Sequence, residues 1–288
     1  MSLIEIKSEI PAATVEAVDA ALNELQVVGW SLLEDAIAKR AWVVGIFASE
    51  QEAQAHWGVL KPLLTGAETP VTRTLVDQDW RDSYKAHFKP WHFGRLHWVP
   101  LWERANYAVP SGHAVIWLDP GLAFGTGNHE TTRLCCERLV KFAERRGLDG
   151  KVIDAGCGSG ILALSAAKMG FSHVAGFDND AEAVRVSEEN AELNQLTGKV
   201  RFFTGDLLSG LAGAPADLLM ANIQADVLMR FAGQLCAAVA PQGSLVLSGI
   251  LATELAQVCA VFSQIAPAWP QETRVMGEWS DLASTRGA

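Results

Sequence analysis

The first 77 residues combine strand-like and helix-like patterns of apolar positions. Polar and apolar side chains alternate over residues 3–8, as expected for a half-buried strand. Apolar residues recur at helical spacing in 12–25 and 50–64, and further strand-like segments lie at 27–33, 42–47 and 70–76. This βαββαβ order is typical of a small ferredoxin-like α+β domain. We therefore predict a separate domain at residues 1–77. It contains no glycine-rich loop and no cluster of titratable groups, so we interpret it as a substrate-recognition domain.

Residues 78–108 differ from this pattern because they are rich in aromatic side chains. Four of the ten tryptophans, Trp80, Trp91, Trp98 and Trp102, lie in this stretch or at its edge. Aromatic side chains in a connector often pack between two domains. They can also form a wall beside an active site, and both interpretations remain open. We predict an aromatic-rich interdomain connector here.

From residue 109 to the end, strand-like and helix-like segments alternate. The expected strands are 114–118, 152–154, 173–177, 200–203, 218–221, 244–248 and 273–277, and the expected helices are 131–144, 161–169, 181–194, 226–238 and 253–265. Such alternation predicts a mainly parallel sheet with helices on both faces. The fold class of residues 109–288 is therefore α/β, Rossmann-like and doubly wound.

The composition is that of a globular protein and argues against a membrane span. Hydrophobic residues make up 49% of the chain and charged residues 19%, both ordinary for a globular domain. No apolar run reaches the roughly 18 to 20 residues needed to cross a bilayer. The first 20 residues lack the basic region and apolar stretch of a signal peptide. We expect a cytoplasmic protein with no membrane partner.

The charge and the cysteines exclude further classes of protein. The formal net charge of −10 disfavours direct binding to nucleic acid, which requires a basic face. The same charge suits a lysine-rich protein partner. The five cysteines are odd in number and include no CxxC pair, which argues against a disulfide framework or a zinc site. We predict buried free thiols and no metal.

The most informative segment is KVIDAGCGSG at residues 151–160, which joins an apolar strand to a helix. Its Gly156, Gly158 and Gly160 allow sharp turns and a close approach of ligand to the backbone. A dinucleotide-binding loop would place its third glycine at position 161, where this chain has Ile161. The spacing D-x-G-x-G-x-G is instead typical of the S-adenosylmethionine-binding loop of class I methyltransferases. A purely structural strand–helix turn is the alternative.

Three polar residues at the ends of later strands support a ligand site. Asp178 ends the next strand, 22 residues after Gly156, and a carboxylate there can accept hydrogen bonds from both ribose hydroxyls. Asn179 and Asp180 can cap the following helix in its place. Asp206 follows the third strand, where it can meet an adenine amino group. Asn222 ends the fourth strand, next to the expected methyl-transfer centre.

A second distinctive segment is LDPGLAFGTGNHETT at residues 118–132. Together with the glycine loop it resembles the methyltransferases that modify large-subunit ribosomal protein L11, whose hallmark is close to LDPGLAFGTGTHPTT followed by DxGCGSGILA. The resemblance extends over nearly the whole chain, including the amino-terminal domain and the aromatic connector. The two motifs together are far more specific than either glycine loop alone.

The resemblance implies a function and a set of site residues. It implies S-adenosylmethionine as cofactor and methylation of amines, namely lysine side chains and the N-terminal amine, of ribosomal protein L11 held by the amino-terminal domain. The implied cofactor contacts are Thr132, Gly156, Asp178 and Asn222, with Phe124 and Gly125 in a loop that closes over the methionine end. The glycine spacing and the strand ends add Gly158, Gly160 and Asp206 as candidate cofactor contacts. Asn222 and His129 are the candidate catalytic residues. His129 either handles the proton of the acceptor amine or orders its loop through a hydrogen bond.

The chain departs from the family pattern near the expected acceptor entrance. Asn128 and Glu130 replace the family's Thr and Pro on either side of His129, and Gln224 replaces an apolar residue after the fourth strand. These changes leave the cofactor-binding residues intact. They bear on which amine is accepted.

Other functions account for the sequence less well. An adenine N-methyltransferase of nucleic acid would carry a D/N-P-P-aromatic segment for a flipped base, whereas residues 222–225 read NIQA. A catalytically silent cofactor-binding module would not require the intact glycine loop, Asp178 and Asn222 together. A methyltransferase for another protein or for a small-molecule amine remains an alternative, although a separate amino-terminal domain favours a protein acceptor.

Overall fold

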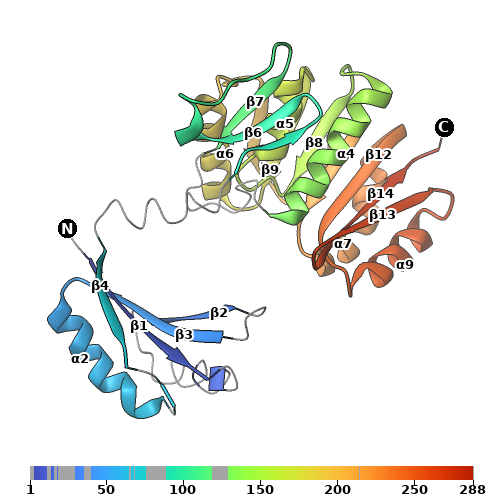
Figure 1. Ribbon diagram of the computed structural model, residues 1–288. Coiled ribbons are helices and arrows are strands. Elements are labelled where there is room, and N and C mark those ends of the chain that lie inside the picture. Colours follow the sequence, from blue (N-terminus) through green and yellow to red (C-terminus); the bar gives the residue numbers. More distant parts are fainter. Residues whose placement is uncertain are drawn as a thin grey trace. The chain divides into compact units, whose positions relative to one another are not determined.

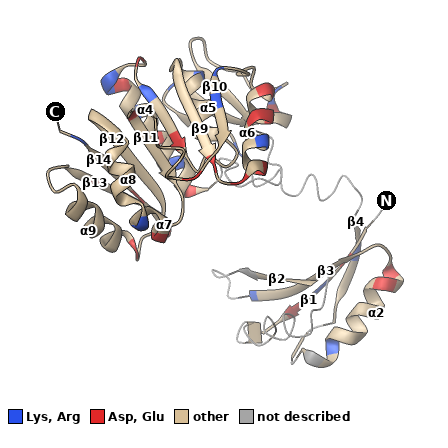
Figure 2. Cartoon of the chain, turned by 180° about the vertical axis from the view of Figure 1, so that it is seen from behind, with Lys and Arg blue, Asp and Glu red and all other residues tan. Residues whose placement is uncertain are grey.

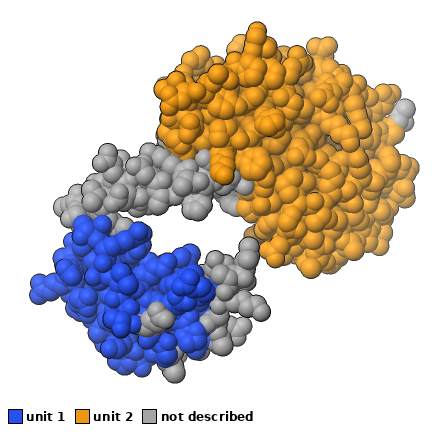
Figure 3. Space-filling view, viewed as in Figure 1, with its two compact units in different colours: residues 1–88 blue, residues 89–288 orange. Residues whose placement is uncertain are grey.

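The computed structural model describes residues 3–11, 14–15, 18, 30–35, 40–64, 66–67, 69–75, 89–118, 129–213 and 215–287. The chain divides into two units, Met1–Phe88 and Lys89–Ala288 (Figure 1, Figure 3). The predicted connector is divided by this boundary, because its residues 89–108 belong to the second unit. Trp80 and the rest of 76–88 lie outside the described residues.

The first unit contains a four-stranded antiparallel sheet in the order β2-β3-β1-β4. The strands are β1 (Leu3–Ile10), β2 (Trp30–Asp35), β3 (Arg40–Phe47) and β4 (Val71–Leu75), and the helix α2 (Glu50–Leu60) continues into a 3-10 turn, η2 (Lys61–Leu63). Alternate residues such as Ile6 and Val43 are fully buried and pack with Trp57 of α2. This arrangement agrees with the predicted ferredoxin-like pattern. The predicted helix at 12–25 lies largely outside the described residues.

The second unit is built on a seven-stranded sheet in the order β10-β9-β8-β11-β12-β14-β13. Its strands are β8 (Lys151–Ala155), β9 (His173–Asp178), β10 (Val200–Thr204), β11 (Ala216–Asn222), β12 (Val239–Leu251), β13 (Gln271–Met276) and β14 (Trp279–Thr285). The first five strands in this order are parallel, and β14 runs antiparallel to both β12 and β13. The prediction of a mainly parallel, doubly wound sheet is confirmed.

Helices cover both faces of this sheet (Figure 1, Figure 2). One face carries α4 (Glu130–Arg146), α5 (Ile161–Met169) and α6 (Ala181–Leu193), and the other carries α7 (Ala225–Arg230), α8 (Ala232–Ala237) and α9 (Leu255–Ile265). Successive side chains of β11 point to opposite faces of the sheet and so belong to two hydrophobic cores. Leu218 and Met220 pack on one face, and Leu219 and Ala221 pack on the other. The single helix predicted at 226–238 is two short helices that meet at Phe231.

The prediction that residues 114–118 join the main sheet is wrong. They form β7 (Ala114–Leu118) of a separate sheet with β5 (Trp91–Phe93) and β6 (Leu96–Pro100), followed by a 3-10 turn, η4 (Leu101–Glu103). The partner of β7 is β6, a strand within the aromatic-rich segment that the sequence did not predict. Trp98 of β6 is fully buried, and its indole N–H donates to Ser165 Oγ at 2.8 Å. The tryptophan thus packs inside the second unit.

Two further sequence expectations concern thiols and membranes. All five cysteines are free, and four of them are buried. Among the described residues, no helix is long and apolar enough to cross a membrane.

Candidate active site

A cavity of about 720 Å³ lies at the carboxyl ends of β8, β9 and β11, where ligands bind in doubly wound sheets. Its volume is within the usual range for small-molecule sites. Five of the ten predicted positions line the cavity, whereas Thr132, Gly158 and Gly160 lie outside its lining. The lining residues are His129, Thr131, Gly156, Phe177, Asp178, Asn179, Gly205, Asp206, Leu207, Asn222, Ile223, Gln224, Val227, Arg230, Phe231, Gly249 and Trp279.

The glycine loop leaves no room for side chains. Gly156, Gly158 and Gly160 all have positive φ angles, of 72°, 53° and 76°, a region that other residues rarely adopt. A Cβ atom on Gly156 would lie 2.4 Å from Ile223 Cγ2. The glycines therefore let the loop pass close to the strand end at β11, as expected for a ligand-binding turn.

Asp178 holds the glycine loop in place. Its carboxylate accepts the backbone N–H of Gly158 at 2.9 Å and that of Asp180 at 3.1 Å. The N-cap of α6 is Asp180, which accepts the N–H of Glu182 at 2.9 Å. Because Asp180 caps the helix, Asp178 faces the cavity, and each carboxylate oxygen retains lone-pair capacity for a ligand hydroxyl.

Asp206 shapes the next loop at the same edge. The Ser209 backbone N–H and hydroxyl, together with the Leu208 N–H, hold the pKa of the Asp206 carboxyl below its usual value. The carboxylate is thus ionised and fixed in orientation. It lies next to the apolar side chains of Leu207 and Phe177 in the cavity lining.

Asn222 presents an unsatisfied oxygen at the end of β11. Its side-chain amide donates to Thr132 Oγ1 at 3.3 Å. Its Oδ1 is buried and has no hydrogen-bond partner among the described residues. A buried polar atom without a partner costs about 1 to 3 kcal/mol. Thr132 lies behind Asn222 and orients the amide so that Oδ1 can accept a hydrogen bond from a ligand.

His129 forms the N-cap of α4. Its Nδ1 accepts from the Thr131 backbone and contacts Thr131 Oγ1 at 2.8 Å. The imidazole packs edge-on against Trp279, with ring centroids 4.8 Å apart. The histidine and the tryptophan form one wall of the cavity.

Asp154 is a buried carboxyl beside the glycine loop that does not line the cavity and that the sequence interpretation assigned no role. It is fully buried one residue before Ala155 and the glycine loop, and burial raises its pKa to about 7. Its Oδ2 accepts the N–H of Ala163 at 3.1 Å, while its Oδ1 has no partner in the described part of the chain. The position of an acidic residue directly before a glycine loop was the available signal.

Other residues of the lining could not be found from the sequence. Trp279 begins β14, a strand that the polar-rich segment WSDLAST did not suggest. Gly249, with φ of 81°, lies where a Cβ would come within 2.3 Å of the Ile223 carbonyl oxygen. Phe124 and Gly125 lie outside the described residues, so their predicted role is not examined by the structure.

The three departures from the family pattern have different surroundings. Gln224 lines the cavity. Glu130 forms an ion pair with Arg133 at 2.9 Å on the first turn of α4. Asn128 lies outside the described residues.

The lining fits a ligand that combines an aromatic base, hydroxyl groups and a cationic end. Phe177 and Leu207 provide apolar surface, and Asp178 and Asp206 provide acceptors for hydroxyl and amino groups. The unsatisfied oxygen of Asn222 is a further acceptor at the end of β11. Acceptors dominate over basic groups, which suits a cation and opposes a pyrophosphate.

Comparison with known proteins identifies relatives over the whole chain. A family model described as "Ribosomal protein L11 methyltransferase (PrmA)" matches residues 2–287. A protein of that name from Geobacter metallireducens is 36% identical over an alignment that covers 98% of each chain. Another from Geobacter sp. strain M21 is 44% identical over 68% of this chain and 64% of its own length. A crystal structure of ribosomal protein L11 methylase from Lactobacillus delbrueckii subsp. bulgaricus is 32% identical, with a TM-score of 0.60, and covers 70% of this chain and 100% of that one.

Proposed function

The chain belongs to the ribosomal protein L11 methyltransferase family, and from its site we propose how it methylates amines of that ribosomal protein. It is an S-adenosylmethionine-dependent methyltransferase. The proposed acceptors are lysine side chains and the N-terminal amine. The observation that carries this proposal is the buried, unsatisfied Asn222 Oδ1 at the end of β11, beside the glycine loop.

The described residues suit S-adenosylmethionine. Asp178 would accept the ribose hydroxyls, and Asp206 would accept the adenine amino group. Gly156, Gly158 and Gly160 would let the backbone approach the cofactor, and Phe124 and Gly125 would lie at its methionine end. When bound, S-adenosylmethionine supplies a methyl group activated by its sulfonium. Thr132 would act through Asn222, whose amide it fixes.

Asn222 and the cavity wall would prepare the acceptor amine. The lysine must be neutral to attack, and its ordinary pKa is about 10.4. A partly apolar wall disfavours the ammonium form and so lowers that pKa. An amine N–H donated to Asn222 Oδ1 would orient the nitrogen lone pair and satisfy the buried oxygen. Alignment of this kind contributes up to about 7 to 11 kcal/mol when the geometry is ideal.

His129 would order this wall and remain the candidate group for the departing proton. Its N-cap hydrogen bond and its contact with Trp279 support the ordering role. Gln224 adds a polar group to the same cavity. Its side-chain amide could form hydrogen bonds with the acceptor, which the apolar residue of the family pattern could not.

The first unit would capture the ribosomal protein. Residues 1–88 contain 13 acidic and seven basic residues, so this part of the chain is complementary to a lysine-rich protein. A ribosomal protein as acceptor supports a cytoplasmic location. No direct contact with nucleic acid or membrane is needed for this function.

The experiment is methyl transfer from labelled S-adenosylmethionine to purified ribosomal protein L11, with mass spectrometry of the product. We expect the wild-type protein to label lysines or the N-terminal amine. We expect Asn222→Ala to lower kcat by about 100- to 1,000-fold, the order found when one transition-state contact is lost, with an unchanged melting temperature. Labelling of no site in the ribosomal protein, or an Asn222→Ala variant as active as wild type, contradicts the proposal.

A further inference from the structure

Two arginines from different elements share one buried carboxylate. Asp281 of β14 is fully buried and accepts hydrogen bonds from Nε and Nη2 of Arg138 on α4, each at 2.9 Å. The same carboxylate accepts Nε of Arg274 on β13 at 3.0 Å. We call Arg138, Arg274 and Asp281 the arginine clamp.

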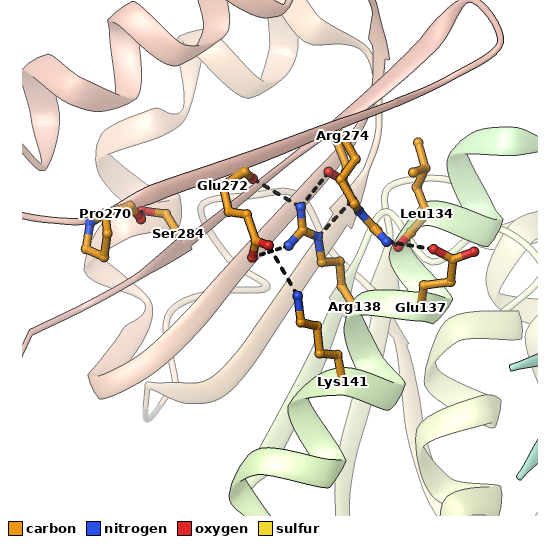
Figure 4. Close-up of polar contacts among 9 residues, drawn as sticks. Leu134, Glu137, Arg138, Lys141, Pro270, Glu272, Arg274 and Ser284 are labelled. Atoms are coloured by element: carbon orange, nitrogen blue, oxygen red, sulfur yellow. Dashed lines mark hydrogen bonds and ion pairs between the residues drawn. The ribbon is translucent and has the colours of Figure 1, made fainter. Parts of the chain in front are cut away.

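The outer contacts of the clamp join the same three elements. Arg274 donates to the Leu134 carbonyl at 2.7 Å and to Glu137 at 2.6 Å, both on α4. Arg138 donates to the carboxylate and the backbone carbonyl of Glu272 on β13 (Figure 4). Every one of these bonds links α4 to the β13–β14 hairpin, so the clamp fixes the helix against the hairpin.

Stability alone is a weak reason for such a group. Removing an ion pair from water costs several kcal/mol per ion, and well-packed hydrophobic residues of similar volume are often as stabilising. Arg138 is only 4% exposed and Asp281 is 0% exposed, so both bear this cost. Apolar side chains would hold α4 and the hairpin together through close packing, whereas the forked guanidinium–carboxylate bonds add a directional constraint on their orientation.

The clamp joins the same two elements, α4 and β14, whose residues form the His129–Trp279 wall. Trp279 and Asp281 are two residues apart on β14, so they face the same side of the sheet. That side carries α4, whose N-cap His129 contacts the Trp279 ring, while Arg138 lies further along the helix and contacts Asp281. A rotation or slide of the hairpin against α4 would therefore move Trp279 relative to His129.

We propose that the arginine clamp positions the His129–Trp279 wall at which the acceptor amine is aligned. Arg138, Arg274 and Asp281 are positioning residues, since none of them lines the cavity. The inference rests on the proposed function, because it assigns the wall to the acceptor amine. Asp178 ends β9 and Asp206 lies on the loop after β10, and neither contacts a residue of the clamp in the described part of the chain.

The test uses two variants of the full-length protein. Arg274→Lys keeps the charge of a residue that is partly exposed, at 29%, but removes the forked geometry that lets one guanidinium serve several acceptors. The triple variant Arg138→Met, Arg274→Met, Asp281→Leu replaces the clamp by apolar residues. Arg185→Lys is the matched control, because Arg185 pairs with Glu182 on the exposed surface of α6, where acidic and basic residues lie together (Figure 2).

Two readouts separate positioning from stability. Trp279 is observed by fluorine NMR in protein labelled with 5-fluorotryptophan, and its signal among the ten tryptophans is assigned with Trp279→Phe. We expect the Trp279 resonance to shift in Arg274→Lys and in the triple variant. We also expect kcat or the acceptor KM to change by about 3- to 100-fold, as for small misplacements of reacting groups. Cofactor affinity should stay within about twofold of wild type, since the cofactor loops keep their contacts.

A folded Arg274→Lys protein with an unmoved Trp279 resonance, or with wild-type kcat and acceptor KM, overturns the proposal. If the triple variant does not fold, Arg274→Lys decides alone. A shifted resonance in a protein whose wild type labels no ribosomal protein refutes the proposed acceptor but leaves the positioning of the wall intact. The two failures are thus distinguishable.

Discussion

At the residue scale, the site depends on a few polar side chains. Each uses some of its hydrogen-bonding capacity within the protein and keeps the rest available for a ligand. Asp178 supports the glycine loop and faces the cavity at the same time. Asn222 uses its amide N–H₂ on Thr132 and keeps its oxygen unsatisfied. Such incomplete satisfaction is costly in an interior and is expected where a ligand completes the bonds.

We predict that Asp178→Ala weakens S-adenosylmethionine binding by about 1 to 3 kcal/mol, the usual cost of lost polar partners. The substitution removes the proposed ribose acceptor and also leaves the Gly158 N–H without its partner. Titration calorimetry measures the affinity. Asp180→Ser, which keeps a good N-cap residue on α6, is the control and should bind normally. Unchanged affinity in Asp178→Ala would refute the assignment of the ribose partner.

Asp154 makes stability depend on pH. Its pKa is raised to about 7 by burial, above the value of about 3.9 in the unfolded chain. The folded state therefore holds a proton that the unfolded state has lost, and the contribution of Asp154 is full below about pH 4 and is lost as pH rises through 7. We predict that Asp154→Asn removes this loss. The free energy of unfolding of the wild type should therefore fall relative to that of the variant between pH 5 and pH 8. Urea unfolding of both proteins at the two pH values measures the difference, and parallel pH dependences would contradict the prediction.

At the element scale, the strand ends and the turns that follow them create the cavity. The loop after β8, the end of β9 and the end of β11 meet at one edge because these strands are parallel neighbours. The bend in β12 at Gly249 brings its backbone against Ile223, in the segment that follows Asn222. The position of Asn222 thus depends on two strands that are adjacent only in the folded sheet.

We predict that Gly249→Ala lowers methyl transfer and destabilises the protein by about 1 to 3 kcal/mol, as for other strained backbone positions. The added Cβ would lie 2.3 Å from the Ile223 carbonyl oxygen at a φ of 81°, so the segment next to Asn222 must move. Gly233→Ala on α8 is the matched control, since nothing lies within 4 Å of its Cβ. The control should be neutral or slightly stabilising. Equal effects of the two substitutions in thermal unfolding and in transfer assays would rule out this role of Gly249.

At the scale of the whole molecule, the cavity lies in the second unit, and the first unit is the proposed site of acceptor recognition. The second unit contains every described residue of the cavity lining, and the first unit contains none. Binding energy gained by an acceptor on a separate domain can be used to orient its amine at the reacting centre. Loss of the first unit should therefore affect the protein substrate and spare the cofactor.

We predict that a truncated protein beginning at Lys89 binds S-adenosylmethionine with nearly full affinity but methylates intact ribosomal protein L11 at least about 100-fold more slowly, because remote binding energy is lost. Calorimetry and a labelled-methyl assay measure the two properties. A soluble truncated protein that methylates at the full-length rate would refute capture by the first unit. Joint loss of solubility and cofactor binding would instead indicate that the first unit covers apolar surface.

The sequence by itself determined the two-part organisation of the chain. It also determined that the glycine loop, Asp178 and Asn222 lie at the ends of strands. These signals are local, since a strand, a glycine turn and a helix follow one another within about 20 residues, and a polar residue at a strand end needs no distant partner to be recognised. Only the tertiary structure decided that 114–118 pairs with β6 and that Asp154 is buried with an unsatisfied oxygen. It alone also decided that Trp279 reaches His129 and that Arg138 meets Asp281 across 143 residues. These features depend on which distant surfaces pack together. The polar segment of β14 can be buried because its charged side chain is paired with arginines in the folded state.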